Sequence, residues 1–131
     1  MLQPNRKMKQ LNFSVMRMMP FIFVSSIVFT TIMALIPIAD VPNPFNLWDK
    51  AQHALAFILL TLTGSLAYNR NTKAVYVGLI LYGAGIEILQ STLTTTRFGE
   101  VSDLIADVVG VTVGFIIYSV ANKILRHQTA E

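Results

Sequence analysis

Four long runs of apolar residues dominate the chain, and none of them contains Lys or Arg in its interior. They cover approximately residues 18–39, 51–68, 74–93 and 101–121. Each run is close to the roughly 20 residues that a helix needs to cross the hydrocarbon core of a bilayer. The runs are too long for strands and lack the alternation of a half-buried strand. We therefore predict an all-α membrane protein, a compact bundle of four transmembrane helices in a single domain over residues 1–131.

The composition supports this fold class and excludes several others. Only 13% of the residues are charged and 53% are hydrophobic, whereas soluble domains carry about 25% charged residues. The absence of cysteine excludes disulfides, thiolate nucleophiles and Cys-based metal sites. Basic residues lie in short clusters between the apolar runs, which argues against a nucleic-acid groove. No small-residue cleavage site follows the first run, so we expect it to be retained as a helix.

The distribution of Lys and Arg between the connections predicts the orientation. Basic residues precede the first run, lie between the second and third, and follow the fourth, at Arg6, Lys7, Lys9, Arg17, Arg70, Lys73, Lys123 and Arg126. The other two connections are roughly balanced in sign. Because Lys and Arg in short loops mark the cytoplasmic side, we predict a multi-pass protein of the bacterial inner membrane with both termini in the cytoplasm.

A few ionisable side chains interrupt the apolar runs, and they share one depth. His53 lies about one turn into the second run, Glu87 the same distance before the end of the third, and Asp107 the same distance into the fourth. At about 1.5 Å rise per residue, each lies roughly 5–9 Å below the outer boundary. Ionisable groups within a membrane usually face a partner or a water-filled cavity. We therefore expect one shared site that opens to the outer side.

Further polar residues accompany these three at helical spacing. Asp49 and His53 are four residues apart, Glu87 and Gln90 three apart, and Asp103 and Asp107 four apart, so each pair shares a helix face. We expect Gln90 in the site, and the rim to be formed by Asp49, Lys50, Arg97 and Asp103.

The motifs resemble the VanZ-like membrane proteins. The resemblance rests on Asp49-Lys50-x-x-His53-x-x-x-Phe57, on Glu87-x-x-Gln90, and on Arg97 followed by Asp103, Asp107, Gly110 and Gly114. It covers roughly residues 40–118. One position departs from the family's pattern, because Asp107 stands where the family usually has Asn.

The resemblance implies a bacterial cell-membrane protein connected with the envelope, since the family is named for a protein linked to resistance to the glycopeptide teicoplanin. It implies no particular reaction. Our leading hypothesis is a module that binds or modifies an anionic lipid or lipid-linked envelope component. Arg97 and Lys50 would hold phosphate or carboxylate, and His53 and Glu87 would be the proton-transfer pair of any reaction.

Two other functions remain open. The chain can be a non-enzymatic scaffold or accessory subunit whose polar network only fixes the helices. It can also be a proton-coupled transporter that works as a homo-oligomer, although no ionisable residue lies in the cytoplasmic half of any run to continue a path. We expect the bilayer as the environment, no nucleic-acid partner and no cofactor. We predict no metal site, because there is no His-x-x-x-His or Cys pair beside the imidazole and carboxylates.

Small residues are expected to allow close helix packing. Gly110 and Gly114 form a small-xxx-small face on the fourth run, and Gly64, Gly78, Gly83 and Gly85 lie in the second and third. Small residues let membrane helices approach closely, so we interpret all six as packing positions.

Overall fold

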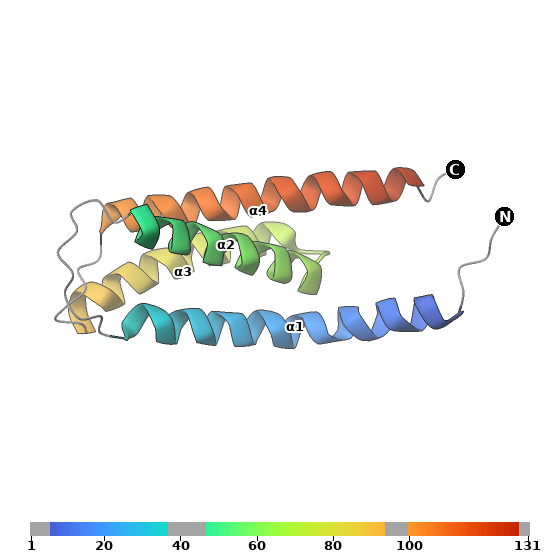
Figure 1. Cartoon of the computed structure of the whole chain (residues 1–131), viewed down its shortest axis with the longest axis horizontal. Helices are drawn as coiled ribbons and strands as arrows, with labels where there is room; N and C mark the ends of the chain where they lie inside the picture. Colours follow the sequence, from blue (N-terminus) through green and yellow to red (C-terminus); the bar gives the residue numbers. More distant parts are fainter. Residues whose placement is uncertain (1–5, 37–46, 94–99, 129–131) are drawn as a thin grey trace.

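The computed structural model describes residues 6–36, 47–93 and 100–128. Within these ranges there are four helices and no strand: α1 (Arg6–Leu35), α2 (Leu47–Ala67), α3 (Thr72–Leu93) and α4 (Val101–Gln128). The predicted all-α fold is confirmed. Successive helices run in opposite directions, and both ends of the chain lie at the same end of the bundle (Figure 1).

Two of the helices extend well beyond the apolar runs that predicted them. α1 begins at Arg6, so the basic residues before Ser14 lie on the helix itself. α4 continues to Gln128. Arg and Lys are good helix formers, so a helix can leave the apolar zone without ending. By length and composition, three helices can cross a membrane, over Ser14–Leu35, Thr72–Leu93 and Val101–Leu125.

Helix α2 differs from the other three because it occupies the middle of the bundle. It lies between α1 and α4, which do not contact each other in the described chain, and it also packs against α3 (Figure 1). Its 21 residues equal the usual length of a span, but its first turns carry Asp49, Lys50, Gln52 and His53. These polar residues lower its hydropathy, and a central position provides protein partners for them.

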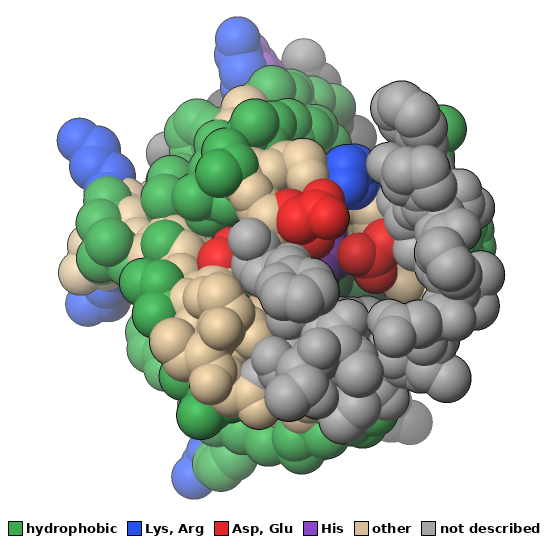
Figure 2. All heavy atoms as spheres, turned by 90° about the vertical axis from the view of Figure 1, so that its left-hand side faces the viewer, with side chains coloured by type: hydrophobic (Ala, Val, Ile, Leu, Met, Phe, Trp, Pro, Cys, Tyr) green, Lys and Arg blue, Asp and Glu red, His purple; other side chains and the backbone are tan. Residues whose placement is uncertain are grey.

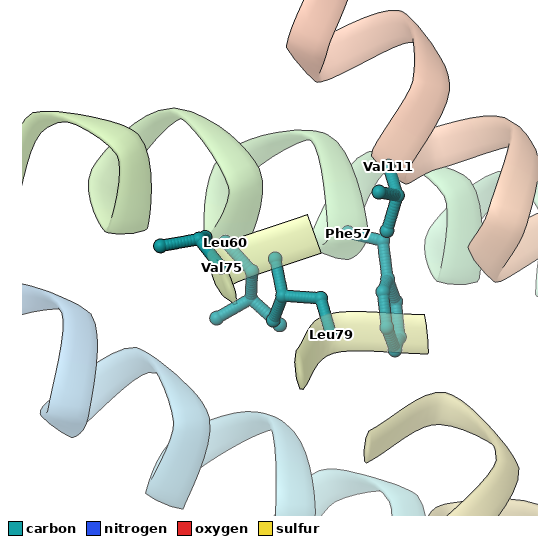
Figure 3. Packing of buried hydrophobic residues seen from close by; sticks show 5 residues of the cluster. All are labelled: Phe57, Leu60, Val75, Leu79 and Val111. Atoms are coloured by element: carbon teal, nitrogen blue, oxygen red, sulfur yellow. The ribbon is translucent and has the colours of Figure 1, made fainter. Parts of the chain in front are cut away.

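The core is a small apolar cluster around α2. It consists of residues from three helices: Phe57, Leu60, Val75, Leu79 and Val111 (Figure 3). Phe57 and Leu60 face α3 and α4 from one side of α2, and each is at most 2% exposed. This cluster fixes the position of α2, and therefore of His53 one turn before Phe57.

Glycines bring α4 directly against α2. A Cβ atom added at Gly110 would collide with the carbonyl oxygen of Ala54, and one added at Gly114 would lie 2.7 Å from Cβ of Thr61. The predicted small-residue face is therefore a real helix contact. Gly64 and Gly83 are also tightly packed, but a Cβ at Gly78 or Gly85 meets nothing within 4 Å. The packing role predicted for those two glycines is wrong within the described chain.

The outer surface of the bundle is apolar. Phe21 and Phe29 on α1, Leu81 on α3 and Val101 on α4 are between 65% and 76% exposed. Hydrophobic side chains form much of the visible outline of the bundle when it is viewed along its long axis (Figure 2). Soluble monomers rarely expose contiguous apolar patches larger than a few hundred Å², so this surface fits a lipid environment.

Candidate functional site

Polar side chains gather at the end of the bundle where α2 and α4 begin and α3 ends. Viewed from this end, acidic side chains, a basic side chain and part of a histidine lie near the middle of the face (Figure 2). Glu87, Asp103 and Asp107 are the buried ionisable residues of the described chain, and all three belong to this cluster. The equal depth predicted from the helix rise thus corresponds to one place in the fold.

His53 and Asp107 join α2 to α4. Nδ1 of His53 lies 2.9 Å from Oδ1 of Asp107, and the two side chains are 11% and 0% exposed. Gly110 follows Asp107 by three residues and allows the two helices to approach closely at this level. A hydrogen bond between such well-buried groups is stronger than one in water, because the local dielectric is low.

Glu87 joins α3 to the start of α4. Its Oε2 accepts the backbone N–H of Glu100 at 2.8 Å. Glu100 is the N-cap residue of α4, because its carbonyl accepts from the backbone of Asp103 and Leu104. A carboxylate at this position is stabilised by the positive end of the helix dipole. Glu87 is therefore held by the first turn of α4.

Lys50 forms the outer layer of the cluster. Its ammonium lies 3.2 Å from Oδ1 of Asp103 and 3.4 Å from Oε2 of Glu100. Hydrogen bonds from Ser102 and Lys50, together with the charge of Lys50, lower the pKa of Glu100. The Lys50 side chain is one-third exposed, so it lies at the surface of the cluster.

The remaining predicted site residues are Gln90, Asp49 and Arg97. Gln90 is buried, and its amide donates to the carbonyl of Ala34 at 3.0 Å, which ties α3 to α1. Asp49 is half-buried in the first turn of α2 and lies near His53 and Asp103. Arg97 lies outside the described residues.

The centre of the cluster brings three ligating atoms close together. One atom each from His53, Glu87 and Asp107 lie within 4.8 Å of one another. Oε1 of Glu87 and Oδ2 of Asp107 are buried and accept no hydrogen bond from the described residues. Gly83 on α3 makes room for Asp107, because a Cβ there would lie 2.9 Å from Oδ2.

A cavity of about 300 Å³ adjoins this cluster, because His53 and Asp49 belong to its lining. It lies mainly between α1 and α2, and its lining is largely apolar, with Asp49, Gln52 and His53 at its polar end. The apolar part of the lining is Phe29, Met33, Ala34, Ile36, Ala56, Phe57 and Ile86, and Thr30 adds a hydroxyl group. The cavity gives an amphiphilic molecule one polar and one apolar environment.

Two features of the site were not predicted from the sequence. The first is Glu100, which caps α4 and binds Lys50. Its acidic side chain just before an apolar run is a sequence signal for the start of a helix. The cavity depends on how α1 lies against α2, and no residue pattern indicates that arrangement.

These observations define a class. The protein is an all-α membrane protein with a buried ionisable cluster at one end of its bundle. The family model VanZ/LLP1 matches residues 2–122, nearly the whole chain, so the protein belongs to the VanZ/LLP1 family. No curated protein matches the chain, and no solved structure matches it.

Proposed function

We propose that this protein binds, or acts on, an anionic lipid or lipid-linked component of the bacterial envelope. The observation that carries the proposal is the cavity between α1 and α2, which is apolar along most of its lining and polar at His53 and Asp49. Ligand sites of this kind are mostly apolar with a few placed polar groups. An acyl or prenyl chain would occupy the apolar part, and the headgroup would lie at the ionisable cluster.

The charge of the headgroup follows from the rim. Lys50 is partly accessible, and among the described residues its ammonium is held by the carboxylates of Asp103 and Glu100, so a phosphate or carboxylate can replace the exposed Glu100 as its partner. Arg97, six residues before Asp103, is proposed as a second anchor, since a guanidinium binds such groups bidentately. In any reaction, His53 would transfer the proton, because the imidazole is the side-chain group whose ordinary pKa lies nearest to neutrality.

The proposed topology places this site on the extracytoplasmic side of the inner membrane. The basic residues of the chain concentrate at the other end of the bundle, on the part of α1 before Ser14, in the turn between α2 and α3, and near the end of α4. Lys and Arg mark the cytoplasmic side. Under this topology α2 is the fourth span, and both termini are cytoplasmic. The glycopeptide resistance for which the family is named would then follow from handling of an envelope lipid.

A structural role is the second candidate, and a specific observation favours it. His53–Asp107, Lys50–Asp103 and Glu87–Glu100 each connect two helices or a helix and the following N-cap. Such contacts can fix helix register without binding a ligand. A transporter is disfavoured, because every buried ionisable residue in the described ranges lies at one end of the bundle.

Native mass spectrometry of the purified protein separates the two candidates. The wild type should retain one lipid per chain, with phosphatidylglycerol preferred over phosphatidylcholine in competition. Ala56→Phe fills the cavity and should abolish retention. Leu59→Phe should not, because Leu59 of the same helix is 54% exposed and does not line the cavity. Equal retention by the two variants would favour the structural role.

A further inference from the structure

We propose that His53, Glu87 and Asp107 form a binding site for a divalent transition-metal ion, Zn²⁺ or Mn²⁺. The three residues come from α2, α3 and α4, and one ligating atom from each lies within 4.8 Å of the others. Protein ligands lie about 2.0–2.2 Å from such an ion, so two of its ligands are at most about 4.4 Å apart. Small side-chain rotations would bring all three atoms to one ion.

Buried oxygens without partners are the independent observation. Asp107 is fully buried and Glu87 is 9% exposed, yet Oδ2 of Asp107 and Oε1 of Glu87 accept no hydrogen bond from the described residues. Leaving a buried acceptor unsatisfied costs about 1–3 kcal/mol, and more for a charged group. Two such oxygens in one cluster indicate that a positively charged partner belongs there.

The described side chains provide little positive charge at this place. Lys50 binds Asp103 and Glu100 in the outer layer, which leaves His53 as the basic group in contact with Asp107. The imidazole contacts Oδ1 of Asp107 through its Nδ1, and it makes no hydrogen bond to either of the two free carboxylate oxygens. A divalent ion would compensate both carboxylates at once.

The donor set determines which ion fits. One imidazole nitrogen with two carboxylate oxygens suits Zn²⁺ or Mn²⁺, whereas Mg²⁺ and Ca²⁺ prefer oxygen ligands alone. Three protein ligands leave a coordination position open, as in catalytic zinc sites. His53 lines the cavity between α1 and α2, so the open position is accessible to water or to a phosphate oxygen.

A second set of ligating atoms, from Asp49, His53 and Asp103, also lies within 4.8 Å. It is the weaker candidate, because Asp103 is already neutralised by Lys50 at 3.2 Å. The two sets share only His53, so substitutions of the carboxylates distinguish them.

Calorimetric titration of tag-free, chelator-treated protein with Zn²⁺ or Mn²⁺ alone tests the proposal, and it needs no lipid. We expect one ion per chain. Loss of an outer-shell partner weakens metal binding by about 10–100-fold, so Glu87→Gln and Asp107→Asn should each weaken it by at least about 100-fold. His53→Gln should do the same, whereas His127→Gln, at the only other histidine of the chain, should not change the affinity.

Several results would overturn the metal site. One is a wild-type affinity for the ion no higher than that of Glu87→Gln. Another is an equal loss of affinity in His53→Gln and His127→Gln. A third is a loss of affinity in Asp49→Asn but not in Asp107→Asn. If Glu87→Gln does not accumulate in the cell, the absorption spectrum of the wild type with added Co²⁺ tests the site instead. Visible absorption bands that disappear in His53→Gln support the site, and their absence from the wild type contradicts it. Lipid retention is measured separately, so failure of either proposal is recognised without the other.

Discussion

His53 and Asp107 lie 54 residues apart in the sequence, and their side chains meet at 2.9 Å in the interior of the bundle. Each residue lies one turn or more inside its own helix, and Gly110 beside them allows the two helices to approach closely. Removing either partner leaves the other buried without this hydrogen bond. This pair therefore links the stability of the bundle to the chemistry of the site.

Asp107→Ala should destabilise the protein by about 1–3 kcal/mol, the cost of leaving a buried hydrogen-bonding group unsatisfied. Asp107→Asn keeps an oxygen near His53, and the resemblance to VanZ-like proteins implies Asn at this position. This variant should therefore lose much less of the free energy of unfolding. Reversible unfolding in detergent measures both free energies. Equal losses for Ala and Asn would mean that the contact with His53 contributes nothing.

Glu87→Ala should loosen the first turn of α4, because the N–H of Glu100 loses its acceptor. We expect faster hydrogen exchange at the amides of residues 100–104 and loss of any resistance phenotype, with the protein still inserted in the membrane. Glu87→Gln retains an acceptor oxygen and should protect these amides. Unchanged exchange in Glu87→Ala, with a normal phenotype and normal protein levels, would remove Glu87 from the site.

Two glycines of α3 provide a matched pair of substitutions. Gly83→Ala places a methyl group 2.9 Å from Oδ2 of Asp107, and such overpacking costs about 1–3 kcal/mol. Gly85→Ala meets nothing within 4 Å and should be neutral or stabilise the helix by up to about 1 kcal/mol. Thermal unfolding of both variants measures the difference. If Gly85→Ala is the more damaging variant, the orientation of α3 described above is wrong.

The topology is tested with reporter fusions. A reporter that is active only in the cytoplasm should work when fused after Glu131, and one that requires export should be silent there. Fusions after Leu93, where α3 ends, should give the opposite result, because the account places this end outside. Export-dependent activity after Glu131 would contradict a bundle with both termini in the cytoplasm.

The meeting of His53, Glu87 and Asp107 was predictable because helix geometry fixes it. With about 1.5 Å rise per residue, the distance of each residue from the end of its helix gives its depth, and polar groups avoid lipid. The contacts that depend on helix rotation were not predictable, and the N–H of Glu100 that binds Glu87 is one example.

The ends of the apolar runs do not coincide with the ends of α1 and α4, because both helices continue into polar sequence. Arg6 and Lys7 lie on α1 because basic residues favour helix, although they lie outside its apolar segment. The cavity was missed for another reason. Met33 and Ala56 line it together, but they are on different helices, and only the arrangement of α1 against α2 brings them to one space.

Site-specific photocrosslinking to cellular lipids tests the central claim most directly. A photoreactive amino acid at Met33, which lines the cavity, is compared with one at Leu59, which faces outward on α2. If the cavity binds lipid, the Met33 probe captures one class of anionic lipid in excess over the bulk membrane, whereas the Leu59 probe captures the bulk mixture. The same lipid mixture at both positions would contradict a binding site in the cavity.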